Sequence, residues 1–293
     1  MRQHYLEVVR SFEPFTDMLR AGATSSQVKE AVIALLDPYV TDKDLLRRLS
    51  VSVLANEATC VAQLSSRPEW KEILDLAFSI RTRAIEASKA IAFDTLCAFE
   101  EHIREAQRKY SLQIVFEQPK EGLKLDEYAF EMFRLIGSLT ESTIQPFLKE
   151  LYCLACIADG RPVSLMAVLR TDFGKVVEDF ERLLSNPNFL APHPWMLRIS
   201  QWRNIAQHHS YKVVGEKVAV HYGKGPTPRS VEVTRDELFL LAKELIRRLG
   251  AMKSTRELTI LNHIGELRPL LPTTGAHVYG TATELVAAFA TQC

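Results

Sequence analysis

The chain has few of the features that mark membrane or secreted proteins. None of its apolar runs approaches the roughly 18–20 residues that a membrane-spanning helix needs. The N-terminal segment has no long apolar stretch before a small-residue cleavage site, so we expect no secretory signal. The five cysteines are odd in number and scattered, unlike a secreted disulfide framework. We therefore expect a soluble, cytoplasmic protein with reduced thiols.

The chain also lacks an excess of charge of either sign. Lysine plus arginine is 36 and aspartate plus glutamate is 36, so the overall charge does not indicate a polyanionic partner. Hydrophobic residues are 47% and charged residues 25% of the 293 residues, a balance typical of a folded protein. We find no internal repeat and no low-complexity tract, and we expect one large or two modest domains.

Apolar residues at helical spacing run through almost the whole first part of the chain. Between Glu69 and about Tyr110 there is neither proline nor glycine, which predicts one long helix or two helices in line. Glu100 and Glu101 are adjacent, so we expect both on the solvated side of this helix. The segment 118–122 combines proline, glycine and charge and is the best interior boundary. Residues 1–118 are therefore predicted to be an N-terminal helical region.

The second part of the chain is helical until about residue 209 and then changes period. A run over 126–158 contains Pro146, which predicts a kink or a split. Residues 164–184 and 195–209 are also predicted to be helical. Residues 212–222 read as two short strands around a Gly-Glu turn, with a third strand at 229–233. Thr234 and Glu237 form a capping box for a further helix. The fold class is mostly α with a small β-hairpin insertion.

One polar group of residues lies at the end of the helix predicted over 195–209. Asn204 and His208 are four residues apart and share a helix face, and the long side chain of Arg203 can reach the same face. A fixed positive charge, an amide and a histidine, the side chain that titrates near neutral pH, can together serve acid–base chemistry. His209 is a candidate helper.

Arg-Asn-x-x-x-His at the end of a long helix, followed by a hairpin and a further helix, resembles the signature of the HEPN superfamily. The resemblance covers roughly 126–253, and we place the HEPN domain at 123–253 with a C-terminal extension at 254–293. It implies a helical bundle with Arg203, Asn204 and His208 as the site. A second pair, Arg256 and His263, has six residues between its members and lies outside this order of elements.

The resemblance implies a metal-independent endoribonuclease that needs no cofactor. In such proteins the RNA 2′-hydroxyl attacks the adjacent phosphate, leaving a 2′,3′-cyclic phosphate. His208 would move a proton, Arg203 would neutralise charge on the phosphorane, and Asn204 would hold His208 or a phosphate oxygen. Family members usually form homodimers in which two motifs face each other, and many act as toxins or antiphage effectors. An antitoxin or a sensor partner stays open.

The charge near the motif is more basic than the chain as a whole. Residues 195–253 contain 11 lysines and arginines against 5 acidic residues, which suits an RNA partner. We expect Lys212, Lys224 and Arg229 to contact phosphates. The alternative is that these charges are solvated faces of the hairpin and of the last helix.

Other interpretations compete with the enzyme. The motif could be a polar helix end whose histidines cap the last carbonyls, and the chain could be a catalytically silent helical module that binds nucleotides or proteins. Cys153 and Cys156 have metal-site spacing but lie in an apolar run without a second pair, so we expect buried structural cysteines. Trp195 and Trp202 are predicted on one helical face, in the core or at a dimer contact.

Overall fold

The computed structural model describes residues 15, 18, 20–49, 51–116, 122–223, 229–267, 269 and 270, without the side chains of 51–53, 55, 56 and 114–116. The helices before the interior boundary are α3 (Ser25–Leu36), η1 (Asp37–Tyr39), α4 (Lys43–Arg48), α5 (Val51–Ser65), α6 (Pro68–Ala87) and α7 (Lys89–Phe116). Those after it are α8 (Leu125–Ser138), η2 (Leu139–Ile144), α9 (Gln145–Ala158), α10 (Leu165–Arg170), α11 (Phe173–Glu181), η3 (Pro187–Phe189), α12 (Ile199–His208), α13 (Arg235–Asn262) and α14 (Ile264–Leu267). The strands are β1 (Tyr211–Val214), β2 (Lys217–Tyr222) and β3 (Arg229–Val233). The mostly α prediction with a small sheet is confirmed.

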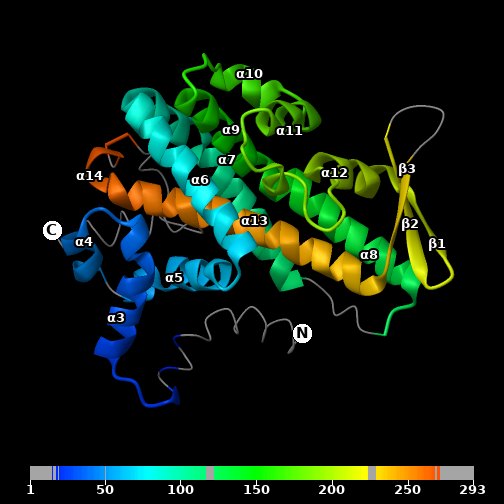
Figure 1. Ribbon diagram of the computed structural model, residues 1–293, viewed down its shortest axis with the longest axis horizontal. Helices are drawn as coiled ribbons and strands as arrows, with labels where there is room; N and C mark the ends of the chain where they lie inside the picture. Colours follow the sequence, from blue (N-terminus) through cyan, green and yellow to red (C-terminus); the bar gives the residue numbers. More distant parts are fainter. Residues whose placement is uncertain are drawn as a thin grey trace.

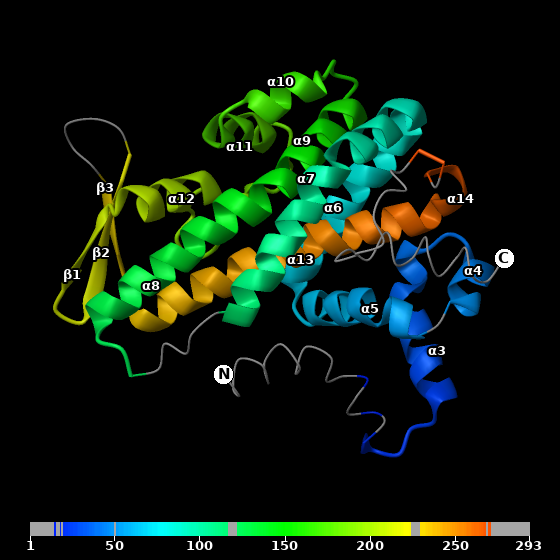
Figure 2. The ribbon, with the colours of Figure 1, turned by 180° about the vertical axis from the view of Figure 1, so that it is seen from behind.

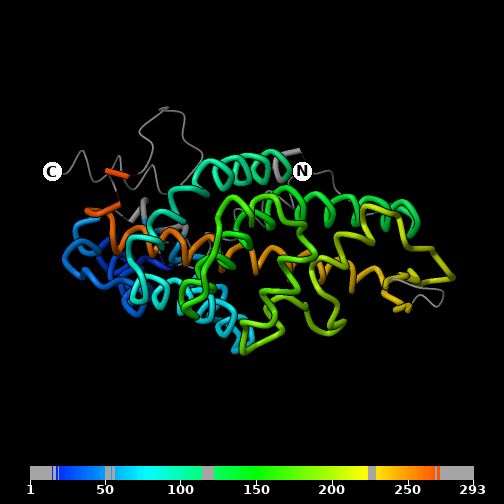
Figure 3. The backbone as a smooth tube through the Cα atoms, turned by 90° about the horizontal axis from the view of Figure 1, so that it is seen from above, coloured from blue at the N-terminus to red at the C-terminus, as the bar shows by residue number. Residues whose placement is uncertain are grey.

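The long helix α13 is the central support of the fold. It crosses the middle of the molecule from the sheet towards α14 (Figure 1), and it packs against α5, α6, α8 and α9. The view from behind shows the same crossing (Figure 2). Seen from above, the sheet lies at one end of the molecule and α3 and α4 lie at the other (Figure 3). Buried side chains from both sides of the interior boundary belong to one connected core.

Helix α13 also crosses the expected limit of the bundle. Its 28 residues continue through Lys253 to Asn262, so a boundary at 253 falls inside a continuous helix. Residues 251–261 of that helix pack into the core with α5 and α6. The N-terminal region and the following helices therefore share one core through α13. Within the described residues, none of the helices combines the length and the apolar character needed to cross a membrane.

Helices α6 and α7 are not in line. The chain leaves the helical conformation at Ser88, which has extended backbone angles, and both helices then pack against α9. Arg81 of α6 bonds to Glu150, and Glu100 of α7 bonds to Arg256. Glu150 and Arg256 also bond to each other, so positions 81 and 100 lie near one another. On one straight helix, two positions 19 residues apart would be about 28 Å apart. The chain thus folds back at Ser88.

The predicted interruption at Pro146 appears as a π-helical turn. Proline has no N–H to donate, and the N–H of Gln145 bonds to the carbonyl of Thr140, five residues earlier. The polypeptide continues from α8 through η2 into α9 without a loop. This turn sets the position of Glu141, which lies within it.

The sheet has the predicted order β1-β2-β3, and both pairs are antiparallel. Gly215 adopts a φ of 60° in the two-residue turn between β1 and β2, a conformation that glycine reaches without strain. Val218, Val220 and Val233 are fully buried, so one face of the sheet packs on the helices. The sheet directly follows α12 and therefore closes the end of that helix.

Candidate active site at the end of helix α12

Helix α12 carries the predicted motif and packs on α8. It buries Trp202, Ile205 and Ala206, which repeat at helical spacing and leave the opposite face open. The two helices approach closely at Gly137 of α8, where an added Cβ would lie 3.2 Å from the Cβ of Ala206. This close packing fixes the distance between α12 and α8, and with it the position of the polar face of α12.

Arg203 is anchored by a carboxylate from another helix. Its Nε donates to Oε2 of Glu141, and Nε2 of Gln207 donates to the same oxygen at 3.2 Å. The Arg203 side chain is 25% exposed, so part of the guanidinium stays open to solvent. Neither Glu141 nor Gln207 was predicted as a site residue. The available signal was Pro146 inside an apolar helical run, because π turns often mark functional sites.

Asn204 lies against Arg203. Its Oδ1 accepts a hydrogen bond from Nη1 of Arg203 at 3.2 Å, and its side chain is exposed. His208, one turn further on, is also exposed and makes no hydrogen bond with any residue that the structure describes. Contacts therefore join Arg203, Asn204 and Glu141, while His208 shares their helix end and presents a free imidazole to solvent.

His209 follows the last helical residue and makes its ring contacts with Phe130 and Tyr211. It has a left-handed backbone with φ 50° and ψ 39°. Its ring is parallel to that of Phe130, with an interplanar angle of 5° and 6.0 Å between centroids. No contact between His209 and His208 supports the role of helper among the described residues, because the ring of His209 packs on Phe130 of α8.

A buried lysine lies close to Glu141. Lys149 of α9 is 4% exposed, and its Nζ donates to the carbonyl of Leu169 at 2.8 Å. Burial lowers the pKa of Lys149, while the nearby carboxylates of Asp172 and Glu141 act in the opposite direction. Glu141 therefore contacts Arg203 directly and acts on Lys149 only through its charge.

Two of the three expected phosphate contacts lie on opposite faces of the sheet. Lys212 pairs with Ala219 and Arg229 with Tyr222 in the sheet register, which places the two basic residues on opposite faces because successive side chains alternate. Both are exposed. Lys224 lies outside the described residues.

Most of the basic surplus near the motif is bound to acidic side chains. Three of the basic residues pair with acidic residues outside 195–253. These ion pairs are Lys253–Glu57, Arg203–Glu141 and Arg198–Glu181. Inside the segment, Glu232 pairs with Lys217, and Glu244 pairs with Arg247 and Arg248. The excess charge in the sequence thus corresponds largely to ion pairs, and a continuous basic patch is not formed by the described residues.

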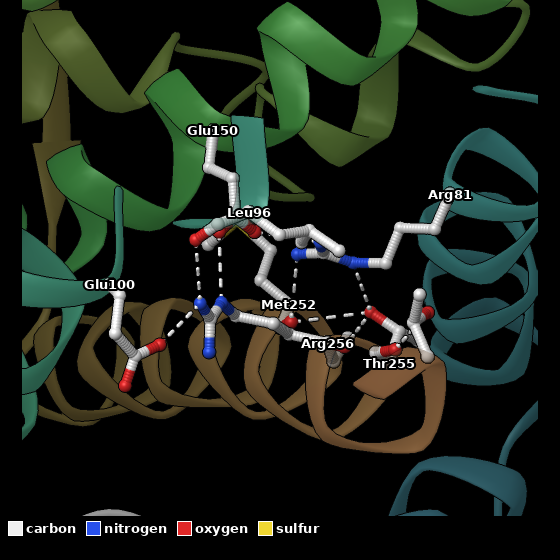
Figure 4. A network of polar contacts seen from close by, with 9 residues as sticks. Arg81, Leu96, Glu100, Glu150, Met252, Thr255 and Arg256 are labelled. Atoms are coloured by element: carbon white, nitrogen blue, oxygen red, sulfur yellow. Dashed lines mark hydrogen bonds and ion pairs between the residues drawn. The ribbon is translucent and has the colours of Figure 1, made fainter. Parts of the chain in front are cut away.

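The second arginine–histidine pair belongs to the core. Arg256 is 1% exposed, donates to Glu150 at 2.8 Å and to Glu100 at 2.7 Å, and also reaches the carbonyl of Leu96 (Figure 4). Arg81 donates to the other oxygen of Glu150 at 2.6 Å. The prediction of a solvated Glu100 was therefore wrong, because that carboxylate neutralises a buried arginine. Glu101 is exposed as expected.

The cysteine pair and the two tryptophans are the remaining candidates. Cys153 and Cys156 are free thiols in the core, which confirms the structural interpretation, and burial raises the pKa of both. Trp195 lies before α12 rather than on it, since the helix begins at Ile199 after the proline-rich loop; its ring still meets that of Trp202 edge to face at 5.7 Å. No three His, Cys, Asp or Glu side chains among the described residues could hold a metal ion together.

Comparisons of the chain with protein-family models, with curated proteins and with solved structures gave no match. What the site can do is therefore argued from its own residues.

Proposed function

We propose that the protein is a metal-independent endoribonuclease of the HEPN type, with Arg203, Asn204 and His208 as its site. The observation that carries the proposal is the arginine–amide pair, oriented by Glu141, at the same solvent-facing helix end as a free histidine. An arginine whose guanidinium is fixed but not enclosed can still donate to a phosphate. The mostly helical architecture, with a hairpin after α12, agrees with the proposal.

The reaction assigns one task to each residue. His208 accepts the proton of the RNA 2′-hydroxyl as the 2′-oxygen bonds to phosphorus. The bond from phosphorus to the 5′-oxygen breaks, and that oxygen takes up a proton. In a homodimer with two motifs facing each other, a protonated His208 of the second copy supplies this proton. One histidine thus gains the proton of the 2′-hydroxyl, and the other loses a proton to the 5′-oxygen. Arg203 and Asn204 donate to the phosphorane oxygens, where negative charge develops.

Glu141 acts on the reaction only through Arg203. Its Oε2 holds Nε of the guanidinium, which leaves the two terminal nitrogens for Asn204 and for a phosphate oxygen. An arginine already held in one rotamer loses less side-chain entropy when it binds the phosphate. The biological role that fits such an enzyme is that of a toxin or an antiphage effector.

The test is cleavage of a mixed RNA pool in the presence of EDTA. We expect cutting by the intact protein, cyclic-phosphate ends, and a loss of about 10²–10⁴-fold in His208→Ala and of about 10²-fold or more in Arg203→Ala. His221→Ala is the matched control, because His221 is an exposed histidine of the sheet. Cutting that survives in both motif variants, or that disappears on chelation, would contradict the proposal.

A growth assay addresses the biological role. Induced expression of the intact protein in a bacterial host should arrest growth, and expression of His208→Ala should not. Equal growth with both forms, in cells where the RNA assay shows active enzyme, would argue against the toxin assignment and leave the ribonuclease in place.

A further inference from the structure

An exposed aromatic ring lies beside the motif. Phe130 of α8 keeps 49% of its surface in contact with solvent, although a phenylalanine in a folded protein is commonly buried. Its ring is parallel to that of His209, 5° between the planes. His209 is itself exposed and directly follows His208. Two aromatic rings are thus open to solvent, one on the residue after His208 and the other stacked against it.

The backbone of His209 adopts a conformation that glycine would accept more readily. A φ of 50° is uncommon for a residue with a side chain, and glycine is the usual residue where a helix ends in the left-handed region. The N–H of His209 caps the carbonyl of Ile205, a bond that glycine would make equally well. Histidine is among the side chains that tolerate this conformation, and here its ring stacks on Phe130.

A second aromatic pair supports the first from below. The rings of Phe133 and Tyr211 stack at 4.2 Å between centroids, and Tyr211 also lies 6.1 Å from His209. Phe133 is 1% exposed, so this lower pair belongs to the core. The upper pair, Phe130 and His209, therefore contacts a partly buried aromatic base through Tyr211.

We propose that Phe130 and His209 form a stacking platform for an unpaired base of the RNA whose phosphate is held by Arg203. The inference rests on the proposed endoribonuclease and adds its substrate class, single-stranded RNA or a loop. Unpaired bases are commonly bound by stacking on aromatic side chains, and such stacking tolerates any base because each has a π face.

The charges around Phe130 indicate which part of a nucleotide it contacts. Phe130 lines a surface hollow of about 420 Å³ with Leu123 and three acidic residues, Asp126, Glu127 and Glu131. Arg134 pairs with Glu131 at 2.7 Å, which leaves Asp126 and Glu127 as the carboxylates that repel phosphate here. We therefore expect the RNA backbone to avoid this hollow. The base contacts Phe130 while the backbone stays on the side of Arg203. The platform therefore contributes affinity without counterion release, and its contribution does not change with salt.

The experiment measures binding apart from cleavage. All proteins carry His208→Ala, and affinity for an unstructured 12-nucleotide RNA labelled with fluorescein is read by anisotropy. Phe130→Ala should weaken binding about tenfold, Phe130→Trp should restore it, and the factor should be equal at low and high salt. Met166→Ala, which removes a 60% exposed side chain from α10, is the control and should bind normally.

Two further measurements separate stacking from a folding defect. His209→Gly should lower RNA affinity while its thermal midpoint stays equal or rises, because glycine suits the backbone there. An oligonucleotide abasic at the stacked position should bind the Phe130-containing protein about tenfold more weakly, and should show no additional loss with Phe130→Ala, since both changes remove the same contact.

The outcomes distinguish this inference from the ribonuclease itself. If intact protein cuts RNA but Phe130→Ala and His209→Gly bind as tightly as their parent, the platform is wrong and the enzyme stands. If Phe130→Ala loses affinity but intact protein does not cut, the platform stands and the enzyme is wrong. A loss that grows steeply at low salt, or one shared by Met166→Ala, would also overturn the platform.

Discussion

Two arginine–glutamate contacts in this protein use the same chemistry in opposite surroundings. Arg256 is 1% exposed and its partner Glu150 is fully buried, whereas Arg203 is 25% exposed and its partner Glu141 is 41% exposed. In the core, every donor that Arg256 uses is directed at protein acceptors. At the end of α12, part of the guanidinium remains available. The spacing and order of elements separate the two arginines in the sequence, and their solvent exposure separates them in the structure.

The difference follows from what each carboxylate must neutralise. Glu150 is shared by Arg81 and Arg256, and Glu100 supplies the second negative charge. This group joins α6, α7, α9 and α13, and its charges balance inside the bundle (Figure 4). Removing one member strands another charge in the core. If either Arg203 or Glu141 is removed, water can solvate the charge that remains.

The largest expected effect is therefore on Arg256. Arg256→Ala should lower the free energy of unfolding by about 3–5 kcal/mol, because it leaves two buried carboxylates, Glu100 and Glu150, with Arg81 as the one remaining cation of the group. Arg203→Ala, the matched control at the surface, should cost less than about 1 kcal/mol. Urea unfolding followed by circular dichroism measures both. Equal losses in the two variants would break the contrast between the two sites.

A second effect concerns Glu257, the neighbour of Arg256. Burial raises the pKa of Glu257 to about 7, and one of its carboxylate oxygens has no hydrogen-bond partner among the described residues. Between the ordinary pKa of about 4.3 and 7, the folded protein holds a proton that the unfolded chain has released, so stability falls as pH rises through this window. The loss is complete above pH 7 and amounts to roughly 3 kcal/mol.

Glu257→Gln removes this titration. The variant should match the parent near pH 4.5 and be more stable at pH 8, with the gap in unfolding free energy opening progressively between these values. Thermal unfolding across that range measures the gap. A constant difference at all pH values would show that the Glu257 carboxyl does not titrate in this window.

The third prediction separates activity from stability at the surface site. Glu141→Gln keeps an acceptor near Arg203 but removes the charge, and it should reduce RNA cleavage about tenfold, the size expected for the loss of one charge-assisted contact. Stability should change by less than about 1 kcal/mol. Glu178→Gln is the control, because Glu178 pairs with Arg182 on the exposed surface of α11. An equal change in cleavage for both variants would remove the special role of Glu141.

The smallest expected effect lies on the sheet. Lys217 and Glu232 form a 3.0 Å ion pair with both side chains more than half exposed. Lys217→Ala should leave the urea midpoint unchanged within error, since salt and water screen such pairs. A measurable shift would mean that exposure is a poor guide to the worth of ion pairs in this protein, and it would weaken the contrast drawn above.

Much of the architecture is visible in the sequence. Helical periodicity predicts α8 through α9, the capping box at Thr234 predicts the start of α13, and the change of period predicts the three strands. These features are local, because they depend on propensities and spacing within one element. The position of the motif at the end of α12 is local in the same sense.

What the sequence does not show depends on distant partners. Glu100 looks solvent-facing on its own helix, and only the approach of Arg256, 156 positions later, makes it a core residue. The fold-back at Ser88 and the contact of Glu141 with Arg203 have the same origin. Neither a period nor a motif records which carboxylate will meet which arginine in three dimensions.

The length of α13 has a consequence for the order in which the protein can mature during synthesis. Arg81, Glu100 and Glu150 are made long before Arg256, the residue that neutralises the surplus carboxylate among them. A growing chain carries the Arg203–His208 segment before it contains the last turns of α13, which pack with α6 at the other side of the core. Domains generally form as units during synthesis. We therefore expect the shared core to be completed only after α13 has been made. The group of four buried charges is thus completed only late in synthesis, when residue 256 joins residues 81, 100 and 150.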